Sequence, residues 1–270
     1  MSQQHILITG GHSGIGLELT RRLMKESGHK LGLVLRSEKR KDSLPEDLLS
    51  SPGLEFFYAD LSDQGSVTKL TQEVAAKWEK LDVLFSNAGV LLDKFYLSDQ
   101  GNEMHLEVNT LAPYLLVKGL IPLFEQTEKP TVVHTVTGNM HRQKSLNLEV
   151  FQSGDSFKKL FGPYLQSKLA LTLLSKEMNS LLPKLRVINV DPGPNKTTMT
   201  QGSGMPGWLM PIRNLLFPKP SKGAGLLYNG AFDPKFQQEK YAYLTSNKHA
   251  PIGMSLGEEE KIFLLSAIKE

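Results

Sequence analysis

The sequence predicts an α/β fold in which one doubly wound, parallel β-sheet is covered by helices on both faces. Three observations lead to this prediction. Short apolar runs alternate with longer segments of helical character along the chain, as in strand–helix–strand units. The runs are almost continuously apolar, which is typical of strands that are buried on both faces. A glycine-rich segment follows the first run, where a strand of such a sheet would turn into a helix.

The predicted elements follow one another without a repeat or a linker, so we expect residues 1–270 to form a single domain. Each predicted strand is rich in aliphatic and aromatic residues; the seven are His5–Thr9, Leu31–Leu35, Glu55–Ala59, Leu81–Ser86, Thr131–Val136, Leu185–Val190 and Tyr241–Leu244. The five predicted helices are Gly14–Glu26, Gln64–Trp78, Asp99–Phe124, Pro163–Leu182 and Ser221–Phe232. The Gly/Pro-rich stretch Pro192–Pro220 is predicted to be an excursion within the fold, with a substrate flap near residues 193–220.

The composition restricts the class of protein. Apolar residues make up 40% of the 270 residues, enough for the core of one large α/β domain. The chain has no cysteine, which excludes disulfides, a thiolate metal site and a cysteine nucleophile, and we expect no metal site. The formal net charge of +3 is too small to indicate a nucleic-acid partner.

The sequence does not predict a membrane span. No apolar run approaches the ~18 residues that a spanning helix needs. The polar start Met1–Gln4 leads directly into a strand, which argues against a cleaved signal peptide, and we expect a cytoplasmic protein. The apolar stretch Trp208–Phe217 is broken by Pro211 and carries Arg213. We expect it to act as a flap over a pocket, and weak contact with a membrane surface is the alternative.

The glycine-rich loop after the first strand has the residues expected of a phosphate-binding turn. Its spacing is T-G-x-x-x-G-x-G, formed by Thr9, Gly10, Gly11, His12, Ser13, Gly14, Ile15 and Gly16. Glycines let the backbone approach a pyrophosphate, and the following helix presents its first N–H groups to it. An ordinary strand-to-helix turn is the alternative for the loop taken alone.

Three further motifs follow in order. They are Asn87-Ala88-Gly89 after the fourth strand, Tyr164-Leu165-Gln166-Ser167-Lys168, and Pro192-Gly193 followed by Thr197. With the loop, they resemble the short-chain dehydrogenase/reductase family, and most of all its retinol dehydrogenase and carbonyl reductase branches. The resemblance implies a Rossmann-like fold, a nicotinamide dinucleotide and hydride transfer between a carbonyl and an alcohol.

Tyr164 and Lys168 are four residues apart and would share one face of a helix. An ammonium nearby would lower the pKa of the tyrosine by about two units, towards the range of a general acid. A core tyrosine with an unrelated surface lysine is the alternative for this spacing alone. The resemblance implies that Tyr164 exchanges a proton with the substrate oxygen, and that Lys168 also holds the nicotinamide ribose.

Asn109 matches the helix asparagine of the family. Pro113, four residues on, has no N–H to donate to the Asn109 carbonyl, so we expect a bend there. The family uses such a carbonyl to hold a water in a proton relay to the lysine. A simple proline kink is the alternative.

The fifth predicted strand leads into Thr137-Gly138-Asn139, where the family has a serine that holds the substrate oxygen. Thr137 offers a hydroxyl and extends the strand without a change of register, so we favour it. Asn139 is the alternative because its amide could donate to the same oxygen, but the chain must first continue through Gly138.

The end of the second strand favours NADP over NAD. An NAD-specific fold has a carboxylate there, whereas this chain has Arg36, which suits a 2′-phosphate. Lys39 and Arg40 could add to the positive field, and a solvated basic loop is the alternative. By resemblance, Asp60 and Leu61 would contact the adenine, Asn87 and Gly89 would line the cofactor site, and Thr197 would contact the carboxamide.

These features together predict an NADP(H)-dependent oxidoreductase acting on an apolar small molecule. The adaptable hydrophobic flap would contain Met199, Met205, Trp208, Leu209 and Met210. A non-catalytic NADP-binding sensor or scaffold is the alternative from another class, and an NAD-linked alcohol oxidase is a third possibility. The segment Met140–Leu160 is longer than is usual in the family and would cover a common dimer face, so we expect a monomer rather than a homodimer.

Overall fold

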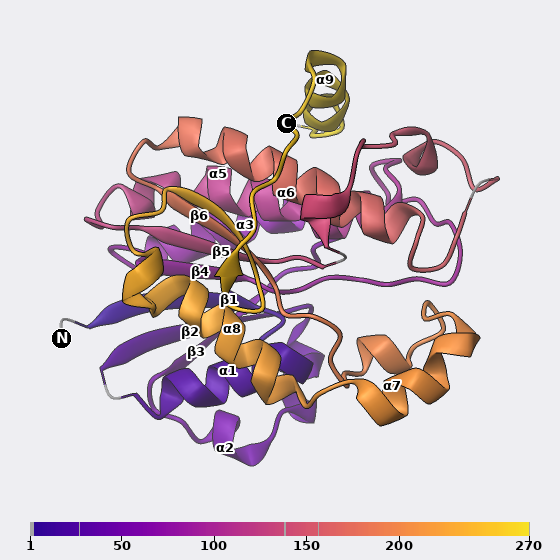
Figure 1. Cartoon of the computed structure of the whole chain (residues 1–270). Helices are drawn as coiled ribbons and strands as arrows, with labels where there is room; N and C mark the ends of the chain where they lie inside the picture. Colours follow the sequence, from indigo (N-terminus) through magenta and orange to yellow (C-terminus); the bar gives the residue numbers. More distant parts are fainter. Residues whose placement is uncertain (1–2, 27, 138, 156, 270) are drawn as a thin grey trace.

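The computed structural model, which describes residues 3–26, 28–137, 139–155 and 157–269, contains an eight-stranded sheet (Figure 1). The strands are β1 (Gln4–Thr9), β2 (His29–Leu35), β3 (Leu54–Tyr58), β4 (Val83–Ser86), β5 (Thr131–Thr135), β6 (Arg186–Asp191), β7 (Tyr241–Thr245) and β8 (Lys248–His249). Their order in the sheet is β3-β2-β1-β4-β5-β6-β7-β8. The first seven strands run parallel, which confirms the predicted doubly wound sheet. β8 was not predicted and pairs antiparallel with β7.

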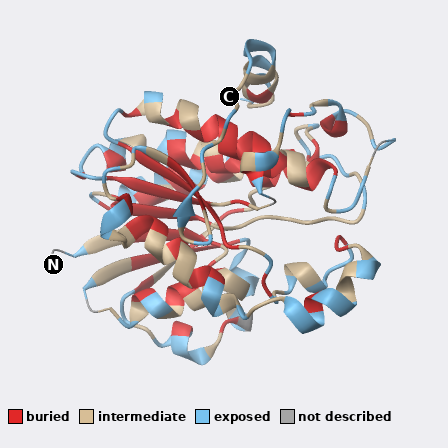
Figure 2. Ribbon diagram, viewed as in Figure 1, coloured by how far each residue is buried: buried red, intermediate tan, exposed pale blue. Residues whose placement is uncertain are grey.

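Helices cover both faces of this sheet (Figure 1). One face carries α3 (Gln64–Lys77), α5 (Ala112–Phe124) and α6 (Pro163–Leu181), and the other carries α1 (Gly14–Met24) and α8 (Pro220–Phe232). Side chains alternate between the two layers: Leu7 packs in the first core, and Ile6 and Ile8 pack in the second. The strands are therefore buried on both faces, as their continuous apolar character predicts (Figure 2).

The predicted helix Asp99–Phe124 is wrong at its start and is interrupted in its middle. Helical structure begins with α4 (Met104–Leu106), continues as a π-helical segment (Glu107–Leu111), and only then becomes α5. The N–H of Ala112 bonds to the carbonyl of Glu107, five residues back. Pro113 cannot donate a hydrogen bond, so the regular α-helical ladder is broken where the bend was predicted.

Several short elements were not predicted because they are too short to show a periodic pattern. They are α2 (Glu46–Leu49), α7 (Met210–Leu216), α9 (Glu258–Ser266) and the 3₁₀ turns Glu38–Ser43, Met140–Arg142, Glu149–Phe151, Met199–Gln201, Gly207–Leu209 and Pro234–Phe236. In α7, Pro211 lies in the first turn, where a helix tolerates proline. Within the described ranges, no helix is both long enough and apolar enough to cross a membrane.

Candidate active site

Most of the predicted site residues lie at or near the carboxyl ends of four neighbouring strands, β1, β4, β5 and β6, whereas Arg36 follows β2 and Asp60 and Leu61 follow β3. The parallel register places Thr9 beside Ser86, and Ser86 beside His134, so these strands end at one level. The strand order reverses between β1 and β4, which is where a doubly wound sheet binds its ligands. The topology therefore brings together motifs that lie far apart in the sequence.

The glycine loop turns from β1 into α1, and its glycines stand where a side chain would collide with neighbouring atoms. Gly14 begins α1 with a positive φ of +53°, and a Cβ there would lie 3.1 Å from the methyl of Thr197. A Cβ on Gly16 would lie 2.1 Å from the carbonyl oxygen of Gly10. These contacts exclude side chains at Gly14 and Gly16. The backbone N–H groups of the first turn of α1, which lack intrahelical partners, are therefore not covered by side chains at these two positions. The side chain of Ile15 instead points towards Gly223 in α8.

Asn87 joins the ends of three strands. Its side-chain amide donates to the carbonyls of Thr9 (3.3 Å) and Gly10 (3.2 Å), and its oxygen accepts the Thr135 hydroxyl at 3.2 Å. The hydroxyl of Thr9 accepts the N–H groups of Asn87 and Ala88. The asparagine of the N-A-G motif therefore holds the glycine loop against β4 and β5.

Tyr164 and Lys168 lie on one face of α6 and are both buried, with 7% and 4% of their surface exposed. The Lys168 ammonium donates to the carbonyl of Thr135 at 3.0 Å, and burial lowers the pKa of Lys168 to about 8. The expected lowering of the Tyr164 pKa is wrong for this structure. Burial, followed by the nearby Asp191 carboxylate, raises the pKa of Tyr164, which keeps the phenol protonated at neutral pH.

Asn109 lies in the π-helical segment, and its side chain links a loop to α6. Its oxygen accepts the N–H of Val90 at 2.8 Å, and its amide donates to the Val90 carbonyl and the Ser167 hydroxyl, both at 3.1 Å. Gly89 packs against the side chains of Asn109 and Lys168. A Cβ on Gly89 would come within 2.9 Å of the Asn109 side-chain oxygen and 3.2 Å of the Lys168 nitrogen. The predicted residues Gly89, Asn109 and Lys168 therefore lie together.

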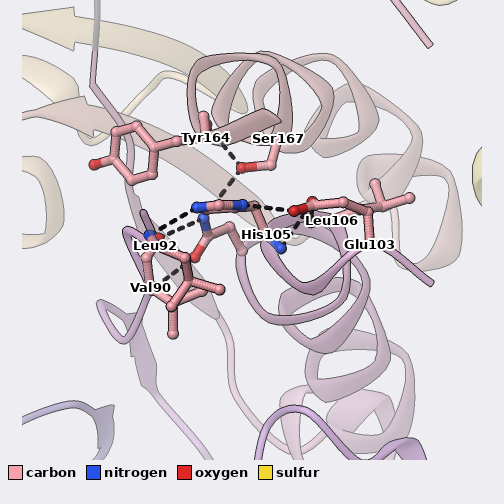
Figure 3. Close-up of polar contacts among 8 residues, drawn as sticks. Val90, Leu92, Glu103, His105, Leu106, Tyr164 and Ser167 are labelled. Atoms are coloured by element: carbon pink, nitrogen blue, oxygen red, sulfur yellow. Dashed lines mark hydrogen bonds and ion pairs between the residues drawn. The ribbon is translucent and has the colours of Figure 1, made fainter. Parts of the chain in front are cut away.

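The sequence prediction missed a buried pair, Glu103 and His105, beside the tyrosine (Figure 3). The Glu103 carboxylate lies 2.7 Å from Nδ1 of His105, and Nε2 of His105 accepts the N–H of Leu92 at 2.9 Å. Because Nε2 accepts, the imidazole is neutral with its proton on Nδ1. The His105 ring meets the Tyr164 ring edge-on, with centroids 6.1 Å apart. The one signal in the sequence was a glutamate at the helix start with a histidine two residues on.

Thr137 and Asn139, the two candidates for holding the substrate oxygen, both follow β5, and the structure does not distinguish between them. β5 ends at Thr135, one residue earlier than predicted, and the half-buried Thr137 follows it. Asn139 is exposed, in the left-handed conformation, and its backbone N–H donates to the Asp191 carboxylate at 3.3 Å. Gly138 lies outside the described residues, and the choice of Thr137 stays a prediction.

The loop after β6 closes the site from the other side. Asp191 ends β6 and accepts the N–H of Gly193, which follows Pro192 and has a φ of +68°. Thr197 hydrogen-bonds within its own turn to Thr200, and its methyl faces Gly14. Thr197, which follows the P-G motif, therefore lies against the glycine loop, and its expected contact with a carboxamide stays a prediction.

Arg36 lies at the end of β2 with two-thirds of its side chain exposed, and it pairs with Asp60 at 2.8 Å. Burial raises the pKa of Asp60, but hydrogen bonds from Ser62 and Arg36 outweigh this and hold the pKa below its usual value. In the glycine loop, burial and then Arg40 lower the pKa of His12, so this imidazole is neutral. Leu61 packs against the core. The Asp60 carboxylate is already bonded to Arg36 and Ser62, and the expected contact of Asp60 and Leu61 with the adenine stays a prediction.

These residues fit a nicotinamide dinucleotide. The glycine loop leaves its backbone bare for a pyrophosphate, and the guanidinium of Arg36 is open to solvent at the ribose end. An ammonium has three donors. Among the described residues, Lys168 uses one of them, on Thr135, so two remain for ribose hydroxyls.

Residues 4–205 match the family model described as short chain dehydrogenase. The chain belongs to the short-chain dehydrogenase family. It is an oxidoreductase by this membership and by its curated relatives. A zebrafish (Danio rerio) polyprenol dehydrogenase is 30% identical over 232 residues, covering 81% of this chain and 70% of the relative. Human retinol dehydrogenase 11 is 25% identical over 224 residues, with the same coverage of 81% and 70%.

Solved structures support the fold of this short-chain dehydrogenase. The Pseudomonas aeruginosa RhlG/NADP active-site complex matches with a TM-score of 0.70 at 19% identity, covering 92% of this chain and 96% of that one. An alcohol dehydrogenase from Thermococcus sibiricus, complexed with 5-hydroxy-NADP, matches with a TM-score of 0.67 at 22% identity, covering 95% and 100%.

Proposed function

We propose that this short-chain dehydrogenase uses NADP(H) to interconvert a carbonyl and an alcohol on an apolar small molecule. The observation that carries the proposal is the buried pair Tyr164 and Lys168 on one face of α6, at the strand ends that also carry the glycine loop. The three elements belong to the chemistry of one reaction: a proton donor, a cation and a phosphate-binding turn.

The preference for NADP rests on Arg36. No carboxylate stands at the end of β2, and the exposed guanidinium there could bind a 2′-phosphate through charge-assisted hydrogen bonds. Asp60 now occupies one side of this guanidinium. Three structural neighbours are complexes with NADP or 5-hydroxy-NADP and one is a complex with NADH, a balance that favours the same choice.

Tyr164 is the proposed proton donor in the reducing direction. Its raised pKa means that the phenol carries its proton at neutral pH and can give it to the carbonyl oxygen. The bound dinucleotide would supply the hydride that the carbonyl carbon receives. Lys168 would hold the ribose and favour the tyrosinate that remains after proton transfer, and Thr137, or else Asn139, would hold the substrate oxygen.

The apolar character of the substrate is proposed from the segment after β6. Met199, Met205, Trp208, Leu209 and Met210 lie in this segment, with Met205 buried and Trp208 exposed. Flexible methionine side chains adapt to substrates of irregular shape. Two curated relatives are named for the alcohols polyprenol and retinol, which supports the same class.

The test is Tyr164→Phe, assayed by NADPH oxidation with a panel of aldehydes and ketones. Loss of the hydroxyl should lower kcat by roughly 10²–10⁴-fold, the usual contribution of a general acid, while NADPH binding stays nearly unchanged. A variant that keeps most of its kcat would place the proton donor elsewhere. A wild-type protein that binds NADPH but reduces no compound in the panel would favour the non-catalytic sensor instead.

A further inference from the structure

The segment after β6 has an unusual balance of charge. From Pro192 to Phe232 the chain contains no aspartate and no glutamate, whereas it contains four basic residues: Lys196, Arg213, Lys219 and Lys222. Three of these, the lysines, are exposed. The surface that this segment presents is therefore positively charged, although the whole chain is close to neutral.

The same segment carries a row of large apolar side chains in solvent. Trp208 is 64% exposed, Ile212 40%, Leu215 81% and Leu216 69%. The helical stretch Gly207–Leu216 spaces them at i, i+4, i+7 and i+8, which places them on one side of a helix. We call these four side chains the α7 apolar face. Such a contiguous exposed patch marks an interaction surface.

A buried arginine attaches α7 to the rest of the molecule. Arg213 is buried, and its guanidinium donates to the hydroxyl of Thr200 (3.1 Å) and to the carbonyl of Thr197 (3.3 Å). The arginine therefore ties α7 to the turn at Thr197–Thr200, and the exposed fractions show that the α7 apolar face points into solvent. The helix stands at the periphery of the molecule, at the lower right of Figure 1, and is mostly exposed in Figure 2.

We propose that the α7 apolar face docks on an anionic lipid surface, with the apolar side chains among the acyl chains and Lys219 and Lys222 at the headgroups. A second copy of the chain would bring two positively charged faces together, which argues against self-association. The stretch Gly207–Leu216 is too short to span a bilayer, so it would lie in the interface. An exposed tryptophan at one end suits the boundary between headgroups and acyl chains.

The proposal does not depend on the reaction. It does, however, place the active site near the lipid: Thr197 contacts the glycine loop, and a Cβ on Gly204 would lie 2.4 Å from the carbonyl of Leu91 in the loop after β4. An enzyme docked in this way would meet an apolar substrate at the membrane surface rather than in water.

Vesicle sedimentation of the full chain tests the proposal. The wild type should sediment with vesicles of phosphatidylcholine and phosphatidylglycerol in equal parts, and far less with phosphatidylcholine alone or in high salt. The double variant Leu215→Ser/Leu216→Ser should lower the partition coefficient by roughly tenfold or more, since two large side chains no longer enter the bilayer. Lys219→Glu/Lys222→Glu should lower binding to the anionic vesicles by a comparable factor.

Ile262→Ser is the matched control, because Ile262 is 59% exposed but lies on α9; it should bind as the wild type does. Trp78 is buried and Trp208 is exposed, so a blue shift of tryptophan emission on adding vesicles would report on α7. An unchanged unfolding midpoint shows that each variant is folded.

Two results would overturn the proposal. The first is that the wild type does not sediment with the anionic vesicles, or that Leu215→Ser/Leu216→Ser sediments with them as strongly as the wild type does. The other is a lipid-free dimer that the serine variant abolishes, which would make the α7 apolar face an interface between copies.

Discussion

His105 contacts three parts of the active site at once. It accepts the Leu92 N–H from the loop after β4, donates to Glu103 at the start of α4, and lies edge-on to the Tyr164 ring (Figure 3). The imidazole therefore sets the position of the loop relative to the tyrosine. It is a positioning residue, since none of these contacts involves the hydroxyl of Tyr164.

Replacing His105 with Phe keeps an aromatic ring beside Tyr164 but leaves the Leu92 N–H without its acceptor. It also leaves the fully buried Glu103 carboxylate without its ring N–H. An unsatisfied buried group costs about 1–3 kcal/mol, so we expect the free energy of unfolding in urea to fall by that amount. We also expect kcat to fall as the loop loses its position. His105 and Glu103 should be coupled, so Glu103→Gln should cost less in the His105→Phe background than alone. Additive losses would contradict the coupling.

Arg36→Ala should weaken NADPH binding by roughly tenfold to a hundredfold and leave NADH binding nearly unchanged, because only the 2′-phosphate needs the guanidinium. Titrations with both nucleotides measure this difference. Arg21→Ala is the control, because Arg21 is also an arginine paired with a carboxylate, that of Asp47, and 37% of its side chain is exposed. Equal losses for the two nucleotides would show that Arg36 does not touch the phosphate.

The identities of the site residues could be predicted from their spacing, but their electrostatics could not. Tyr164 and Lys168 stand on one face of α6 as expected. The rise of the Tyr164 pKa depends on burial and on Asp191, which reaches the site from β6. The Lys168 ammonium donates a hydrogen bond to the carbonyl of Thr135 on β5. A sequence spacing within one helix holds no information about either contact.

At the scale of elements, β5 carries an unusual buried histidine. His134 is fully buried; its Nε2 lies 3.3 Å from the sulfur of Met178, and its Nδ1 has no partner within the described part of the chain. Burial, followed by the charge of Lys168, lowers the pKa of His134 to about 3 from an ordinary 6.5. The folded strand therefore holds this imidazole neutral where an unfolded chain would protonate it.

This difference predicts a loss of stability in mild acid. Between pH 6.5 and about 3, His134 binds a proton in the unfolded state but not in the folded state. The free energy of unfolding therefore falls as the pH falls. The loss by pH 5 should be roughly 2 kcal/mol, at about 1.4 kcal/mol for each pH unit. Urea unfolding of wild type and His134→Leu at several pH values measures it, and the leucine variant should lose less. Parallel pH curves for the two proteins would show that His134 does not titrate in this way.

The strands could be predicted more reliably than the helical segment before α5. A buried strand is visible in the sequence as a short apolar run. The seven predicted strands begin and end within a few residues of β1 to β7. Pro113 allowed the bend to be predicted, but the contacts of the Asn109 side chain with Val90 and Ser167 could not be, because they are not local in sequence. Likewise, the hydrogen bond from Arg213 in α7 to Thr200 joins residues that are 13 apart in the sequence.

At the scale of the whole molecule, the long segment between β5 and α6 bears on the oligomeric state. Met140, Leu146, Val150 and Phe151 from this segment are buried in the same core as the residues of α6. The segment therefore covers part of α6 that would otherwise be free for a partner.

We accordingly expect a monomer of 30.0 kDa in sedimentation equilibrium at all loading concentrations in the absence of lipid. A mass twice that value that does not change on dilution would contradict this expectation. The measurement also provides the baseline for the vesicle experiment, because it detects self-association through the α7 apolar face directly.

The antiparallel β8 limits how copies of the protein can meet at high concentration. Without it, β7 would present a free edge of N–H and C=O groups, onto which a strand of another chain could add. The chain instead turns back through Ser246 and Asn247, both with positive φ, into two exposed residues, Lys248 and His249. An edge this short, with a lysine on it, offers little for intermolecular pairing. β8 pairs with Leu244 and Thr245, so at this end of β7 the hydrogen-bonded ladder stops within one molecule, which limits edge-to-edge addition of another chain there.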